Sequence, residues 1–367
     1  MFLIQNKPAT ALEKLSMINK VTILDALFGF IDVASTATAR ATFYNTKKEQ
    51  AEALEVVHDH LFGIDRSLYT ACLMLPGVND YSKQVGIKHL LLNKREGEQL
   101  LTDEQERLVI DKIIQKMPVP RMLNLFITIR KQRINNARTR KVILRSILNG
   151  RNLPLWSVRY RRKIGVALEH AWGKRTVGIL RSILKKTERT PQENNILKTN
   201  ITKYLYRKNQ ADKVFECIGF ILGNRENLTL PILKAFVEAK TDLTKGKKLP
   251  FEVLEGIRGR FFKEEITSAE VLNWTKKTLT TTQKMTLQNK AKTSGVKVNL
   301  NPMKYDAVKL YIYAYSQGMT DEIREALNEK AKNAAQKMPM SFDHVGILVD
   351  GSESMRGNEA QALRPIA

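Results

Sequence analysis

The sequence has few cysteines, no long apolar runs and no signal-peptide pattern at its start. Cys72 and Cys217 are its only cysteines, and each lies in an apolar stretch with helical spacing. We therefore expect two buried thiols in a reducing compartment rather than a disulfide. The apolar runs are short and interrupted, so no segment is predicted to cross a membrane. The first residues lack a charged region followed by a long apolar one. Together these absences predict a cytoplasmic protein.

The common signatures of catalysis are missing as well. The sequence contains no H-E-x-x-H, Walker or G-x-S-x-G motif, so neither a zinc protease, a P-loop enzyme nor an α/β-hydrolase is indicated. His58 and His60 are two residues apart, and such positions on a helix point about 200° apart and cannot share one ion. We interpret His58, Asp59 and His60 as a solvated turn, and His89 as an isolated histidine. The prediction is a protein that is not an enzyme.

What the chain has in abundance is positive charge. Its 367 residues include 61 Lys and Arg against 37 Asp and Glu, a formal net charge of +24, while 43% of the residues are hydrophobic. That hydrophobic fraction is enough for a sizeable core, so the chain is not expected to be disordered. A charge surplus of this size indicates polyanionic partners.

Apolar residues recur at helical spacing along most of the chain, with Gly, Pro and Asn between the periodic segments. This pattern predicts an all-α array of helices joined by short turns, without a clean sequence repeat. Residues 290–302 are predicted to form a loop. The expected helices cover residues 20–34, 47–62, 103–116, 120–134, 137–148, 156–172, 175–186, 191–205, 211–222, 231–238, 305–317 and 321–337.

The helical pattern ends at Met338-Pro339-Met340, and one strand-like run, Val345 to Val349, follows. We place the domain boundary here, with a helical module at residues 1–338 and a second segment at residues 339–367. Asp350, Ser352 and Ser354 come directly after the strand-like run. Their oxygens suit Mg²⁺, but one carboxylate and two hydroxyls make an incomplete site, so any binding is expected to be weak. The alternative is a Ser/Asp-rich turn that holds no metal.

The positive charge is concentrated. Residues 112–168 contain fifteen Lys and Arg and no acid, and five more basic residues follow between Glu169 and Glu188. A second acid-free stretch, residues 271–305, carries seven lysines. Basic residues could simply solvate outer helical faces, but such faces usually mix both signs of charge. The uniform sign favours nucleic acid binding.

Helical spacing selects the candidate contacts. Arg138, Lys141 and Arg145 share one stripe of a predicted helix, and Arg159, Arg162, Lys163 and His170 share a face of the next. Trp156 and Tyr160 could stack on bases, but their spacing is more typical of core residues. Asn135 and Asn136 are more typical of a helix cap than of an RNA contact. The candidate RNA-binding residues are Arg130, Arg133, Arg138, Lys141, Arg145, Arg159, Arg162, Lys163, His170 and Lys174.

Several stretches resemble the TROVE family of Ro-type RNA-binding proteins. They are the basic block at residues 134–173, LPFEVLEGIRGRF at residues 249–261, and QKMTLQNKAK with NPMKYDAVKLYIYAYSQG at residues 283–318. The LVDGSESMRG segment that follows, residues 348–357, resembles the start of a von Willebrand factor type A domain, whose metal site also needs a later Thr and Asp that cannot be matched here.

The resemblance implies a ring of HEAT-like helical repeats followed by the first strand of a truncated α/β type A domain. It further implies a ribonucleoprotein that binds small non-coding RNA on a basic outer surface and single-stranded RNA ends in a central hole. Protein partners would contact the type A domain. The alternative function is a protein-interaction adaptor whose basic surface faces an acidic protein.

Overall fold

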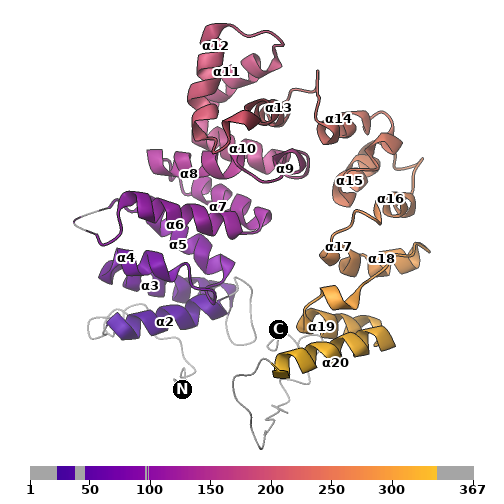
Figure 1. Ribbon diagram of the computed structural model, residues 1–367, viewed down its shortest axis with the longest axis horizontal. Coiled ribbons are helices and arrows are strands. Elements are labelled where there is room, and N and C mark those ends of the chain that lie inside the picture. The colour runs from indigo at the N-terminus through magenta and orange to yellow at the C-terminus, as the bar shows by residue number, and fades with distance from the viewer. Residues whose placement is uncertain (1–22, 38–45, 96, 98, 337–367) are drawn as a thin grey trace, which may run out of the picture. The chain divides into compact units, whose positions relative to one another are not determined.

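The computed structural model describes residues 23–37, 46–95, 97 and 99–336 (Figure 1). Within these ranges the ordered elements are α-helices and short 3-10 helices, with no strand among the described residues. The predicted all-α class is therefore confirmed for this part of the chain. Packing divides the chain into two compact units, unit 1 at residues 1–234 and unit 2 at residues 235–367. The sequence predicted no division here, and it falls inside the short helix α14 (Pro231–Glu238).

Unit 1 is built from α-helices with two short 3-10 helices near its end. They are α2 (Ile23–Thr36), α3 (Lys47–Ile64), α4 (Arg66–Cys72), α5 (Asp80–Leu92), α6 (Asp103–Lys116), α7 (Val119–Lys131), α8 (Ala137–Leu148), α9 (Leu153–Arg159), α10 (Arg161–Trp172), α11 (Lys174–Lys185), α12 (Pro191–Asn200), η1 (Thr202–Tyr204), η2 (Lys208–Gln210) and α13 (Ala211–Ile221).

The helices of unit 1 pack mainly on helices that are near in sequence, which makes the unit an array rather than a single closed bundle (Figure 1). α10 is central to the basic region, because it contacts α7, α8, α11 and α13. The apolar stripes that the periodicity predicted are the buried ones: Phe126, Ile143, Leu168 and Phe220 are fully buried. Burial of such stripes, rather than local helix propensity, supplies most of the stability of short helices.

One predicted helix is two helices in the structure. The chain breaks at Tyr160, which ends α9 and begins α10 with φ −120° and ψ 19°. Trp156, on α9, packs so closely on Gly150 that any side chain at position 150 would collide with the indole ring. The prediction of one continuous helix over residues 156–172 was wrong, because the apolar spacing continues through the break and hides it.

Other boundaries differ as well. The helix predicted for residues 191–205 ends at Asn200 and continues as the 3-10 helix η1. The loop predicted for residues 290–302 begins inside a short helix, α18 (Gln288–Thr293). Helices α4, α5, α15 (Phe251–Phe261), α16 (Ser268–Thr275) and α17 (Thr281–Thr286) were not predicted. Asn136, by contrast, caps α8 as expected, since its side chain accepts a hydrogen bond from the Thr139 amide.

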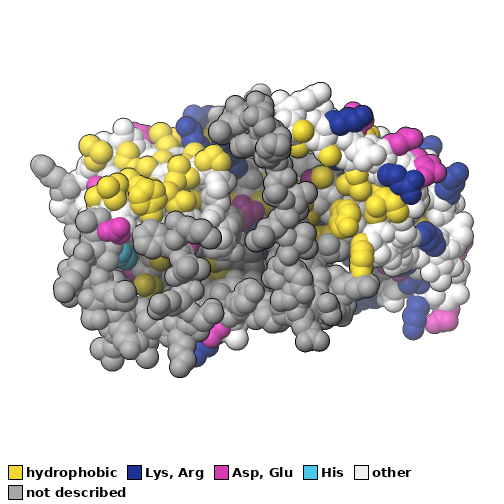
Figure 2. Space-filling view, turned by 90° about the horizontal axis from the view of Figure 1, so that it is seen from below, with side chains coloured by type: hydrophobic (Ala, Val, Ile, Leu, Met, Phe, Trp, Pro, Cys, Tyr) yellow, Lys and Arg dark blue, Asp and Glu magenta, His cyan; other side chains and the backbone are white. Residues whose placement is uncertain are grey.

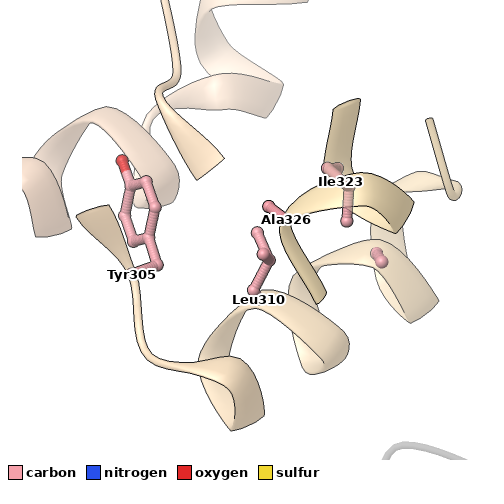
Figure 3. Close-up of a cluster of buried hydrophobic side chains, with 5 residues drawn as sticks. Tyr305, Leu310, Ile323 and Ala326 are labelled. Carbon is pink, nitrogen blue, oxygen red and sulfur yellow. The ribbon is translucent and has the colours of Figure 1, made fainter. Parts of the chain in front are cut away.

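Unit 2 contains shorter helices and a smaller core. Its elements are η3 (Leu243–Gly246), α15 (Phe251–Phe261), α16 (Ser268–Thr275), α17 (Thr281–Thr286), α18 (Gln288–Thr293), η4 (Pro302–Lys304), α19 (Ala307–Gln317) and α20 (Asp321–Gln336). Leu310 of α19 packs with Ile323 and Ala326 of α20, beside Tyr305 (Figure 3). Asp321 and Glu322 open α20 as predicted. The predicted boundary after residue 338 and the strand-like run lie outside the described residues.

Candidate nucleic-acid interface

The predicted RNA-binding residues fall into three groups in unit 1. The α8 group comprises Arg138, Lys141 and Arg145. The α10-start group comprises Arg159, Arg162 and Lys163. The α11-start group comprises Arg130, Arg133, His170 and Lys174.

The α8 group faces acidic side chains of α6. Arg138 lies 2.5 Å from the carboxylate of Glu106, which is only 2% exposed. The same carboxylate receives two hydrogen bonds from Arg66, at 2.8 and 2.9 Å. Burial alone would raise the pKa of Glu106, but the hydrogen bonds from Arg66 and the charges of Arg138 and Arg66 outweigh burial and lower it. Arg138 is therefore part of a buried ion-pair network.

The rest of the α8 group has similar surroundings. Arg145 lies 3.7 Å from Asp111, a carboxylate on α6 that is itself buried. Burial raises the pKa of Asp111, although the charge of Arg145 opposes that shift. Burial, together with the nearby charges of Arg107 and Arg145, lowers the pKa of Lys141. The stripe predicted from helical spacing thus exists, but it packs against α6.

The α10-start group is more open. Arg162 and Lys163 are exposed in the first turn of α10. Lys163 donates a hydrogen bond of 3.0 Å to the side chain of Asn124 on α7. Arg159 belongs to α9, and its guanidinium lies 5.5 Å from the centre of the Tyr160 ring. Because of the break at Tyr160, Arg159 does not continue the helical face of α10, which corrects the predicted common face.

One hydrogen bond links the two segments that carry the α11-start group. His170 Nε2 lies 2.8 Å from the carbonyl oxygen of Ile134, so the end of α10 touches the turn between α7 and α8. That turn carries Arg133, whose φ is +58°, and Arg130 lies just before it. Arg130, Arg133 and Lys174 are all exposed. This hydrogen bond between residues far apart in the sequence links the end of α10, which precedes Lys174, to the turn that carries Arg133.

The starts of α10 and α11 carry cations where helices usually carry acids. Neither N-cap, Tyr160 or Gly173, makes a side-chain hydrogen bond to its helix. The first turns contain Arg161-Arg162-Lys163 and Lys174-Arg175, without an acid. The positive end of the helix dipole disfavours cations. An anion bound there would interact favourably with the dipole and accept hydrogen bonds from first-turn amides, which have no acceptor within the helix. Arg175 is exposed and was missed, although the basic run after Glu169 marks it.

Five other helices begin in the opposite way. α3, α6, α12, α16 and α17 each start with a capping box, in which a Thr and a Glu or Gln bond reciprocally. Such a box satisfies two of the amides that would otherwise lack partners. The starts of α10 and α11 are about 18 Å apart along α10, at about 1.5 Å per residue. They can therefore contact separate phosphates of one strand.

The predicted metal ligands Asp350, Ser352 and Ser354 lie outside the described residues. Among the residues that the structure describes, no group of three or more His, Cys, Asp or Glu side chains could hold a metal ion. The described helices also include none that is long and apolar enough to span a bilayer. Cys72 and Cys217 are free and buried, as predicted. Burial raises the pKa of the Cys217 thiol to about 12.

The interpretation of His58 as part of a solvated turn was wrong. His58 is fully buried within α3, with Nδ1 2.5 Å from the Tyr69 hydroxyl and Nε2 2.9 Å from that of Ser82. Burial lowers its pKa to about 3. His89 is not isolated either, because its Nε2 lies 2.7 Å from the Glu55 carboxylate. Position 58 faces the core, which the mixed local sequence did not reveal.

No protein-family model, curated protein or solved structure matches the chain.

Proposed function

We propose that this chain is a non-catalytic RNA-binding protein of the Ro/TROVE type, which holds small structured non-coding RNA and single-stranded RNA ends in a ribonucleoprotein. The observation that carries the proposal is the set of exposed cations at the starts of α10 and α11. Arg162, Lys174 and Arg175 are exposed and form no ion pair among the described residues. Both helix starts also lack a side-chain cap.

These groups suit phosphate chemistry. Lys and Arg that neutralise phosphates release bound counterions, which drives association and makes it depend on salt. The guanidinium fork of Arg162 or Arg175 matches two phosphate oxygens at once. The amides in the first turn of a helix are ready donors to an anion. A flexible single strand can adapt its phosphates to both helix starts more easily than a stiff duplex.

The α8 group has a different part in this proposal. Arg138 and Arg145 hold α8 on α6 through Glu106 and Asp111. Since α8 in turn contacts α10, the ion pairs position the surface that carries the exposed cations. The wider arrangement, HEAT-like repeats closed into a ring, belongs to the same proposal and rests on the resemblance in sequence.

The test compares two sets of substitutions in the full chain. In the exposed set, Arg162, Lys163, Lys174 and Arg175 are replaced by Gln. In the α8 set, Arg138, Lys141 and Arg145 are replaced by Gln. Fluorescence anisotropy with a labelled single-stranded RNA at several salt concentrations gives log K against log salt. The exposed set should flatten this slope by up to about 3, from about 0.7 per phosphate contact. The α8 set should mainly lower stability.

An unchanged affinity and slope in the exposed set would contradict the proposal. Competition then separates the kinds of RNA. An RNA with a single-stranded tail should compete better than a blunt duplex, because A-form helices hide their base edges. If RNase does not remove the co-purifying material and an acidic protein is retained instead, the result favours the protein-interaction adaptor over RNA binding.

A further inference from the structure

A pocket of about 200 Å³ opens in unit 1 between the end of α11 and the first half of α13. Its walls come from three segments: residues 184–189, which end α11 and follow it, residues 212–216 of α13, and residues 224–228, which follow α13. Pockets that hold whole drug-sized ligands measure about 300–1,000 Å³. This pocket is smaller, and its size suits a single ring system.

The wall that follows α13 is held in place by its own hydrogen bonds. Glu216 of α13 accepts hydrogen bonds from the amides of Thr229 and Leu230, at 2.8 and 2.7 Å. Asn224 Nδ2 donates to the carbonyl oxygen of Leu184 at the end of α11, at 3.2 Å. These bonds join all three segments. The pocket is therefore formed before any ligand binds, which lowers the entropy cost of binding.

The inside of the pocket offers apolar and flat surfaces. Leu184 is buried, while Phe215 and Leu228 are half-buried. The Cζ atom of Arg189 lies 5.8 Å from the centre of the Phe215 ring, so the pocket has an aromatic ring beside a planar cation. Unpaired bases stack on such rings and guanidinium groups.

The pocket also carries charges of both signs that are available to a ligand. Arg189 donates only through Nε, to the carbonyl oxygen of Ile183 at 3.3 Å, so both of its Nη groups remain available. Asp212 and Glu226 are exposed, and their carboxylates form no ion pair within the described part of the chain. The whole lining contains three cations and three acids. This balance does not favour a phosphate, although the chain has a net charge of +24.

Guanine carries the complementary pattern of donors and acceptors. Its N7 and O6 accept hydrogen bonds at one edge, where a guanidinium binds through two donors. Its N1–H and 2-amino group donate at another edge, and an ionised carboxylate only accepts. Arg189 lies on the segment after α11, whereas Asp212 and Glu226 lie on α13 and the loop after it. Adenine does not match, because a donor lies beside its N7 acceptor.

The opposite end of unit 1, where α2 lies, is different in kind. Ile23, Leu24 and Phe28 of α2 are exposed, and Figure 2 shows apolar side chains gathered there. The identity of a base is read mainly by hydrogen bonds to its edges, which apolar side chains cannot supply. The pocket, by contrast, has both a stacking surface and polar groups.

We propose that this pocket binds one unpaired guanine base of the RNA. The base stacks on Phe215, Arg189 donates to its N7 and O6 edge, and Asp212 and Glu226 accept from its other edge. The inference rests on the proposed RNA binding and adds a base preference to it. The ends of α11 are about 17 Å apart, at about 1.5 Å per residue. That distance equals about five nucleotides of a stacked strand at about 3.4 Å each, so a strand bound at the start of α11 can reach the pocket.

A uridine-rich single strand with one guanosine tests the pocket. Its affinity for the full chain is measured by anisotropy and compared with that of the same strand carrying inosine, which lacks the 2-amino group. The parent chain should bind the guanosine strand about fivefold more tightly, or better. Asp212→Asn/Glu226→Gln should lose this preference, because an amide presents an N–H to the donors of the base.

The control variant is Glu188→Gln/Glu264→Gln, which makes the same change in net charge. Both of its positions are exposed, and neither lines the pocket. Glu188 is next to Arg189 in the sequence, so the control also tests an acid close to the pocket. It should keep the preference of the parent chain for guanosine.

Failure of the pocket and failure of RNA binding give different results. If the parent chain binds both strands equally, or the pocket variant keeps the preference, the guanine site is wrong and RNA binding stands. If neither strand binds, RNA binding fails, and saturation-transfer NMR with free guanosine and free inosine decides the pocket. A stronger signal from guanosine that the pocket variant loses then supports the site. Equal signals from the two nucleosides, or none, overturn it.

Discussion

The cations of α8 and those at the starts of α10 and α11 come from one strongly basic region, residues 112–187, in which Glu169 is the only acid, yet their surroundings differ. Arg138 and Arg145 lie beside buried carboxylates of α6, whereas Arg162 and Lys174 are exposed. The difference arises from packing. The acids that pair with α8 belong to α6, which lies two helices earlier in the chain. A run of one charge in a sequence therefore shows where cations are abundant, but not which of them are available to a ligand.

The same contrast holds for the starts of the helices. α6, which supplies the acids, begins with a capping box and three acidic residues, an arrangement that suits its dipole. α10 and α11 begin with cations and without a side-chain cap. The acids of α6 pair with cations of α8, whereas Arg162 and Lys174 are exposed at the starts of α10 and α11. The cations thus divide into structural ones, paired with buried acids, and available ones, exposed at the helix starts.

The largest expected effect is on stability, at Glu106. In Glu106→Gln the guanidinium of Arg66, which is 5% exposed, loses its charged partner inside the protein. Breaking a buried ion pair from one side typically costs about 3–5 kcal/mol. Urea denaturation of the variant and the parent chain measures the loss. Glu104→Gln is the control, because Glu104 is largely exposed and pairs only with Arg107, so its loss should stay below about 1 kcal/mol. Equal losses would contradict the division.

A smaller effect is expected from acid, and it comes from His58. Its folded pKa of about 3 lies below its ordinary value of 6.5, so below pH 6.5 the unfolded chain binds a proton that the folded chain does not. Stability should therefore fall as the pH falls from about 6.5 toward 3, by about 2 kcal/mol at pH 5. The free energy of unfolding at pH 7.5 and 5 measures it.

The control for acid is His58→Gln, which should lose most of this pH dependence. Glu55 does not contribute to the loss of stability between pH 7.5 and 5. A hydrogen bond with His89 is the main cause that lowers its pKa to about 2, so its contribution is complete above its ordinary pKa of 4.5 and is lost only between 4.5 and 2. The exposed-set variant should show the same fall as the parent chain, since Lys and Arg do not titrate in this range. A fall restricted to the parent chain would link the exposed cations to stability.

The smallest expected effect has opposite signs for stability and binding. Lys174→Glu places an acid in the first turn of α11, where the helix dipole should stabilise the fold by about 0.3–1 kcal/mol. The same change should weaken RNA binding. Arg181→Glu is the control, because Arg181 is an exposed position later in α11 and should bring no gain in stability. Thermal unfolding and anisotropy measure the two effects. A loss of stability in Lys174→Glu would mean that Lys174 is structural.

The sequence by itself determined the helical class of the described residues, the burial of both thiols, the cap at Asn136 and the concentration of positive charge. These features depend on residues within about one turn of each other, or on composition. The apolar stripes of α8 and α10 repeat every three or four residues, and Asn136 bonds to an amide three residues later. Local spacing and local hydrogen bonds are readable without knowing how the chain packs.

Only the tertiary structure decided which charges are satisfied and which positions are core. Arg138 and Glu106 are 32 residues apart in the sequence, and His58 reaches Ser82 across 24 residues. The break at Tyr160 is likewise accompanied by packing of Trp156 on Gly150, while the local apolar pattern continues unchanged. Each of these outcomes depends on which distant side chain arrives beside a residue. The free energy of a charge or a polar ring depends strongly on that neighbour, because burial removes the water that would otherwise solvate it.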